Sequence, residues 1–234
     1  MIEQRRQVSG DPVDLALITL IGGSASPRVV DVGGGSGTRA VPLAIQGCSV
    51  TVIDSSVDAL AILHRRAQDA GVAARVTGVQ ADADLVLCHH LLEEVDDPVA
   101  VLDAIAEAVR PGGHVSVLVA GRLGAVVGQT LAGRFEEARA MLTDPDGRFA
   151  PTDPLRRRYD AAGIGELLAR AGLTVDSVTG VGVLSGLVSG AARQAIPGGD
   201  SELARLESDA AVHPALLQIA ADLHVVAHKP DRGS

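Results

Sequence analysis

Aromatic residues are nearly absent from the 234-residue chain, which contains two phenylalanines, one tyrosine and no tryptophan. We therefore do not expect a surface that binds nucleic acid by stacking bases on exposed rings. Basic residues are also in the minority, since 20 Lys and Arg face 29 Asp and Glu and leave a formal net charge of −9. This balance argues against a broad electrostatic grip on nucleic acid, although it allows a local basic patch.

Cysteines and long apolar runs are scarce as well. Cys48 and Cys88 lie within apolar segments, where we expect buried, reduced thiols. No apolar stretch approaches the roughly 18–20 residues that a bilayer span requires, and residues 1–12 lack the apolar segment of a secretion signal. We therefore expect a cytoplasmic protein without membrane contact. Arginine-rich composition, with Lys229 as the one lysine, indicates a GC-rich bacterial gene.

Strand-like and helix-like patterns alternate along the chain, which predicts an α/β fold with a mostly parallel sheet covered on both faces. We expect one domain over residues 1–234, with a partly helical insertion at 184–213 before the last strand. The predicted strands are 28–32, 49–53, 75–79, 84–88, 114–120, 173–183 and 219–228. The predicted helices are 11–21, 38–46, 55–70, 98–109, 123–142 and 160–171.

A glycine-rich turn follows the first predicted strand. Glycines allow positive φ and let a ligand approach the backbone, and the next helix offers free N–H groups. A dinucleotide fingerprint would require glycines at positions 33, 35 and 38, but residue 38 is Thr38 and the third glycine is Gly37. Asp31, at the tip of the strand, would repel a phosphate and suit a cationic or hydroxyl-rich ligand.

A second acidic residue, Asp54, ends the second predicted strand 21 residues after Gly33 (54 − 33). An acid in this place hydrogen-bonds the ribose hydroxyls of a nucleoside ligand. NAD and S-adenosylmethionine both carry such a ribose, and the glycine spacing together with Asp31 favours the second. The alternative is that Asp54 only caps the following helix.

These motifs carry a resemblance to a known family. From about Pro27 onward the chain resembles class I S-adenosylmethionine-dependent methyltransferases, with VVDVGGGSG (29–37), TVID (51–54) and the RPGG turn (110–113) in the expected order. The resemblance implies a Rossmann-like fold with a seven-stranded sheet. Within that class, DLVLCHHLLEEVDDPVAVL (84–102) is closest to the tRNA 5-carboxymethoxyuridine methyltransferases.

The resemblance also implies a cofactor and site residues. S-adenosylmethionine would bind at the strand ends, with Asp54 on its ribose, Ala81 and Asp82 on its adenine, and His89 beside the methyl group. Glu94 stands where that tRNA family has an aromatic residue, which bears on the acceptor more than on the cofactor. The residues expected to bind the cofactor are Asp31, Gly33, Gly34, Gly35, Gly37, Asp54, Ala81, Asp82 and His89.

Candidate acceptor-binding and catalytic residues follow the later strands. His89 could contact the cofactor or act as a base toward a hydroxyl substrate. Arg122 and the run Arg156, Arg157 and Arg158 could meet a substrate carboxylate or an RNA phosphate. We expect Glu93 to lie, with its neighbour at 94, on a solvated helix face.

Three functions remain open. A methyltransferase acting on a tRNA wobble uridine carboxylate predicts a positive patch around Arg122 and residues 156–158. A methyltransferase acting on a small acid or hydroxyl metabolite predicts an active-site entrance that is closed and either acidic or apolar. A binding protein that has lost turnover predicts a blocked cofactor pocket.

One connection is too short for this fold. If the third strand runs to Val79, the chain must cross roughly 20 Å to reach the fourth strand. Gln80–Ala83 spans at most ~14 Å when fully extended. Either the third strand is displaced or absent, or residues between Asp82 and Asp84 are missing from the chain as given.

Overall fold

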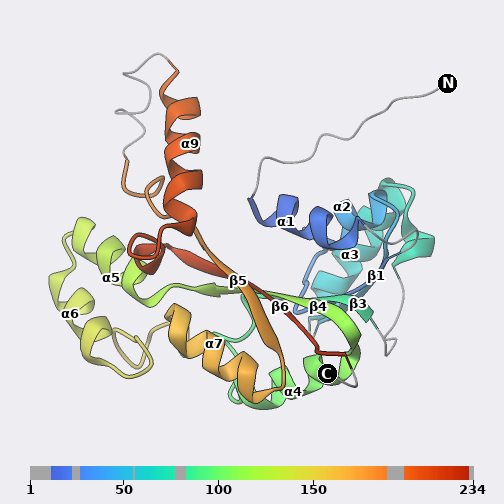
Figure 1. Ribbon diagram of the computed structural model, residues 1–234, viewed down its shortest axis with the longest axis horizontal. Helices are drawn as coiled ribbons and strands as arrows, with labels where there is room; N and C mark the ends of the chain where they lie inside the picture. Colours follow the sequence, from blue (N-terminus) through green and yellow to red (C-terminus); the bar gives the residue numbers. More distant parts are fainter. Residues whose placement is uncertain (1–11, 23–26, 55, 77–82, 189–197, 232–234) are drawn as a thin grey trace.

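The computed structural model describes residues 12–22, 27–54, 56–76, 83–188 and 198–231. Over these ranges the protein forms a twisted sheet with helices on both faces (Figure 1). The strands are β1 (Arg28–Val32), β2 (Ser49–Ile53), β3 (Ala83–His89), β4 (Val109–Ala120), β5 (Thr174–Val181) and β6 (Asp222–His228). The helices are α1 (Pro12–Ile21), α2 (Ala40–Ile45), α3 (Val57–Asp69), α4 (Pro98–Ala108), α5 (Arg122–Leu131), α6 (Phe135–Thr143), α7 (Ala161–Arg170) and α9 (Gly199–Val212), with short 3₁₀ turns η1 (Ala73–Arg75) and η2 (Leu217–Ile219).

The strand order is β2-β1-β3-β4-β6-β5. The first four strands in this order are parallel, whereas β6 runs antiparallel to both β4 and β5. The carboxyl ends of β1 to β4 therefore meet at one edge of the sheet, which is where open α/β sheets bind ligands.

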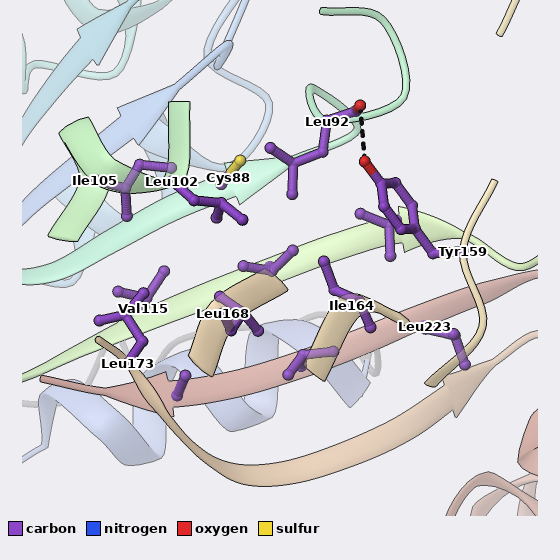
Figure 2. Close-up of a cluster of buried hydrophobic side chains, with 14 of the residues drawn as sticks. Cys88, Leu92, Leu102, Ile105, Val115, Tyr159, Ile164, Leu168, Leu173 and Leu223 are labelled. Atoms are coloured by element: carbon purple, nitrogen blue, oxygen red, sulfur yellow. Dashed lines mark hydrogen bonds between the residues drawn. The ribbon is translucent and has the colours of Figure 1, made fainter. Parts of the chain in front are cut away.

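Alternating side chains along the strands build two cores. Val30 and Val86 face the core under α4 and α7, whereas Val29 and Leu85 face the core under α1, α2 and α3. Figure 2 shows the first of these cores, where the Tyr159 hydroxyl donates a hydrogen bond to a backbone carbonyl at 3.0 Å. Because both faces are covered, most residues of the central strands are apolar on both faces.

The two cysteines lie inside these cores. Cys48 packs in the core under α1, α2 and α3, and Cys88 in the core under α4 and α7. Both are buried free thiols, as the sequence predicts. None of the helices in the described ranges combines the length and apolar composition that a membrane span requires.

The sheet has six strands within the described residues, where the sequence predicts seven. The predicted third strand falls mostly on residues outside the described part, but Val76 forms an isolated parallel pairing with Val50. From Val76 the chain has seven residue steps to Ala83 (83 − 76), or at most about 24 Å. Three strand spacings plus the offset along the sheet require only about 16 Å. The connection is therefore long enough when the pairing ends at Val76.

Other predicted elements also differ in extent. The helix expected over 123–142 is two helices, because Gly133 adopts φ +75° after α5 and turns the chain into α6. The strand expected from His114 begins at Val109, and the residues 110–113 form an irregularity in its pairing with β3.

Candidate active site

The glycine turn joins β1 to α2 and needs glycine for two separate reasons. Gly33, Gly35 and Gly37 have φ values of +75°, +53° and +78°, in the left-handed region that favours glycine. At Gly37 a Cβ would lie 2.2 Å from a methyl group of Leu63, and at Gly34 it would lie 2.4 Å from the Asp31 carboxylate. The turn therefore has no side chains at these positions, so a ligand can approach its backbone closely.

Asp54 extends from the end of β2 over this turn. Its Oδ2 accepts a hydrogen bond from the Gly35 N–H at 2.8 Å, and its Oδ1 accepts one from the Ser56 N–H at 2.7 Å. The cap of α3 is Ser56, whose hydroxyl accepts from the Ala59 N–H at 3.2 Å. Asp54 is therefore not the residue that caps α3.

A cavity of about 560 Å³ opens beside the glycine turn at the carboxyl ends of β1 and β3. Four of the residues expected to bind the cofactor border it, whereas Gly35, Gly37 and Asp54 lie in or over the turn itself. Ala81 and Asp82 fall outside the described residues. The cavity is lined by Asp14, Asp31, Gly33, Gly34, Thr38, Arg39, Pro42, His89 and His90.

The most perturbed carboxyl in the cavity is Asp31, which is only 3% exposed. Burial raises its pKa to about 7. The positive charge of Arg39 lowers this pKa, and the negative charge of Asp54 raises it further, but both effects are smaller than that of burial. Arg39 in turn forms an ion pair with Asp14 of α1, with 2.7 Å between Nη1 and Oδ1. Sequence reasoning missed Arg39 and Asp14, since the only signal was a basic residue directly after the glycine turn.

His89, at the end of β3, belongs to a buried polar row across three strands. Its Nε2 lies 2.9 Å from the Ser116 hydroxyl, which lies 2.8 Å from Nε2 of His224. Its Nδ1 is buried and has no hydrogen-bond partner among the described residues. Burial, followed by the charges of Arg39, His224 and His90, holds the pKa of His89 well below its usual range. The imidazole is therefore neutral at physiological pH.

The residues after His89 build a second polar group. His90 adopts φ +53°, the one positive φ among the described non-glycine residues. Its Nδ1 lies 3.2 Å from Oε1 of Glu93, which also accepts the Ala120 N–H at 2.6 Å. This hydrogen bond raises the pKa of His90. The expectation that Glu93 is solvated is wrong, because its side chain is 1% exposed and accepts the hydrogen bond of a backbone N–H at the end of β4.

The predicted acceptor-binding arginines are bonded within the protein. Arg122 donates to the backbone carbonyls of residues 142, 144 and 145, and Arg157 donates to those of 92, 95 and 96. Arg158 makes two hydrogen bonds to the Asp153 carboxylate, at 2.7 and 3.1 Å. The side chain of Arg156 is 55% exposed and pairs with a neighbouring carboxylate.

The sheet is mixed, with four parallel strands and an antiparallel β6; a glycine turn follows β1, an acid follows β2, and a cavity opens at the ends of β1 and β3. This is a Rossmann-like methyltransferase fold. The chain belongs to the methyltransferase domain family, whose model matches residues 1–178. A ubiquinone biosynthesis O-methyltransferase of Cupriavidus pinatubonensis is 37% identical over 116 residues, which cover 46% of this chain and 47% of that protein. The match thus spans about half the length of this relative.

Solved structures share the fold. An S-adenosylmethionine dependent methyltransferase from Mesorhizobium loti superposes with a TM-score of 0.60 at 18% identity, covering 95% of this chain and all of that one. An O-methyltransferase from neocarzinostatin biosynthesis, solved with S-adenosylmethionine and 2-hydroxy-5-methyl naphthoic acid, is 26% identical with a TM-score of 0.53. That comparison covers 87% of this chain and 49% of the other.

Proposed function

We propose that the protein is an S-adenosylmethionine-dependent methyltransferase whose acceptor is a hydroxyl group of a small molecule. The family membership supports methyl transfer. The names of the Cupriavidus relative and of the naphthoic acid complex support an oxygen acceptor. The observation that carries the proposal is that the neutral His89 lines the cavity and that its Nδ1 has no hydrogen-bond partner among the residues that the structure describes.

The cavity fits the cofactor by its chemistry. Asp54 has a free lone pair on each carboxylate oxygen after its two backbone hydrogen bonds and can accept from ribose hydroxyls. Gly33 and Gly34 leave room for the ligand along the turn, and Asp31 offers a carboxyl to positive charge. Ala81 and Asp82 remain our proposal for the adenine. The bound cofactor supplies a methyl group activated by a positive sulfonium.

His89 is the residue we assign to the acceptor. When Nε2–H donates to Ser116, Nδ1 carries the lone pair and can accept a hydrogen bond from the acceptor hydroxyl. The row through Ser116 to His224 fixes the ring orientation. With the cofactor bound, Nδ1 would take up the hydroxyl proton while the oxygen bonds to the methyl carbon and the methyl–sulfur bond breaks, which leaves a neutral thioether. Because the pKa of His89 is low, its main contribution is in-line placement of the oxygen.

The tRNA acceptor has less support. Binding a wobble carboxylate and the surrounding phosphates would require free guanidinium groups near the site. Arg122, Arg157 and Arg158 already donate to protein carbonyls or to Asp153. Arg156 is the exposed member and has its own carboxylate partner. The open cavity of about 560 Å³ likewise favours an enzyme over a binding protein with a blocked pocket.

The test is transfer of labelled methyl from S-adenosylmethionine to four acceptors: a hydroxybenzoate, an aliphatic alcohol, an aliphatic carboxylic acid, and tRNA carrying 5-carboxymethoxyuridine. We expect methyl ethers from a hydroxyl acceptor. His89→Gln is expected to lower kcat about 100-fold or more while cofactor affinity stays within about twofold. The control is His228→Gln, at the opposite end of the sheet. Methylation of tRNA or the carboxylic acid alone would refute the hydroxyl acceptor, and cofactor binding without any transfer would favour a binding protein.

A further inference from the structure

A second cavity, of about 470 Å³, opens beside α6 and the loop that follows it. This volume lies in the range of small-molecule pockets. No described residue lines both this cavity and the one beside the glycine turn. Figure 1 shows α6 well separated from α1 and α2, which border the other cavity. The cavity beside α6 is therefore a separate candidate site.

Side chains hold the loop of this cavity in shape. Asp144 Oδ1 accepts the Arg148 N–H at 3.1 Å, and Asp153 Oδ2 accepts the Phe149 N–H, also at 3.1 Å. The Arg122 guanidinium donates to three backbone carbonyls at the end of α6 and the start of the loop. Because these bonds exist without a ligand, the cavity is preformed, and binding does not have to order the loop first.

Arg148 brings an incompletely bonded guanidinium to the cavity wall. Its Nη2 donates to the backbone carbonyls of Ala150 and Pro151, at 3.4 and 3.0 Å. Its Nε is buried and, like Nη1, has no hydrogen-bond partner among the described residues. Unlike Arg156 and Arg158, it forms no ion pair with a carboxylate in the described part of the chain. A guanidinium of this kind favours an anionic ligand, and a carboxylate in particular.

Phe149 gives the cavity an aromatic wall. It is one of only three aromatic residues in the chain, and it lines this cavity while belonging to neither hydrophobic core. Pro145 and Pro151 add apolar surface beside it. The wall therefore suits a flat ring. Asp144 also lines the cavity, and its negative charge disfavours a doubly charged anion more than a singly charged one.

We propose that this cavity binds a small aromatic monocarboxylate. The ring packs on Phe149 and the two prolines, and the carboxylate accepts a hydrogen bond from Nη1 of Arg148. The site is additional to the active site, and its occupation requires neither the cofactor nor the methyl acceptor.

The experiment is calorimetry on the full chain without cofactor, with benzoate, cyclohexanecarboxylate, benzyl alcohol and inorganic phosphate as probes. We expect benzoate to bind about 10-fold or more tightly than benzyl alcohol, which lacks the charge. It should also bind about 3- to 10-fold more tightly than cyclohexanecarboxylate, which lacks the aromatic ring. Phosphate should bind more weakly than benzoate. Absence of benzoate binding, equal affinity for benzyl alcohol, or tighter binding of phosphate would each overturn the proposal.

Variants of the two wall residues locate the ligand. Arg148→Gln should weaken benzoate about 10- to 100-fold, and Arg148→Lys, which keeps the charge, should weaken it less. Phe149→Leu should remove the preference for benzoate over cyclohexanecarboxylate and leaves the guanidinium in place. Arg170→Gln, on the exposed surface of α7, controls for loss of one positive charge and should stay within about twofold of wild type. Wild-type benzoate affinity in both Arg148→Gln and Phe149→Leu would place the ligand elsewhere and overturn this site. Because the assay contains no cofactor, a failure of methyl transfer does not affect its outcome.

Discussion

Replacing Asp31 by asparagine is expected to stabilise the ligand-free protein at alkaline pH relative to wild type, although it should weaken cofactor binding. The folded-state pKa of Asp31 is about 7, against 3.8 for an ordinary aspartate, because the side chain is buried. The unfolded chain therefore releases this proton near pH 4 and the folded protein near pH 7. Between these values folding takes up a proton, so the wild-type free energy of unfolding decreases as the pH rises, and it levels off above pH 7.

The magnitude follows from the same pKa. One pKa unit corresponds to about 1.4 kcal/mol, and the interval from pH 5.5 to the folded pKa covers about 1.5 units. The Asp31 carboxyl therefore lowers wild-type stability by about 2 kcal/mol between pH 5.5 and pH 8. An asparagine has no such titration. The stability of Asp31→Asn relative to wild type should accordingly increase by about 2 kcal/mol over this range.

Urea unfolding of both proteins at pH 5.5 and pH 8 measures this change. The pH-independent effect of the amide on packing cancels, because only the difference between the two pH values is used. The charged and titratable groups facing Asp31, namely Arg39, Asp54, Asp14, His89 and His90, are present in both proteins. Asp103→Asn, an exposed substitution on α4, controls for loss of one negative charge. A stability difference that is the same at both pH values, or that falls at pH 8, would refute the reasoning.

Three other predictions concern the packing of buried residues. Arg158→Ala should destabilise the protein by about 3 kcal/mol in urea unfolding, because it leaves the fully buried Asp153 carboxylate without its ion pair, whereas Arg156→Ala should cost less than about 1 kcal/mol. Gly37→Ala should cost about 2–4 kcal/mol in the same assay and abolish cofactor binding in calorimetry, since the methyl group meets a leucine of α3 and φ is +78°. Burial raises the pKa of the Cys88 thiol, so the native protein should not react at Cys88 with a thiol reagent over hours, and rapid native labelling would contradict this assignment.

Much of the cavity could be predicted from local sequence patterns. The alternation of strands and helices, the glycine turn and Asp54 each depend on residues within one short segment, where periodicity and glycine conformation determine the backbone. The parallel order then brings the strand ends together. Asp31, Gly33, Gly34 and His89 line one cavity in the structure, as such an edge requires.

The tertiary structure alone decided which polar groups meet. Ser116 lies 27 residues from His89 and 108 residues from His224, so no local pattern indicates the row they form. The Arg39–Asp14 pair likewise joins residues 25 positions apart, one directly before α2 and the other on α1.

The arginine run at residues 156–158 shows how a local pattern can suggest a function that tertiary contacts do not support. Its charge density indicated a surface for an acceptor, but loops from distant parts of the chain supply carbonyls and Asp153 to its guanidinium groups. Local sequence determines backbone conformation through short-range sterics and periodicity. The partners of a long polar side chain depend instead on the packing of segments far apart in the chain, and that packing exists only once the sheet has formed.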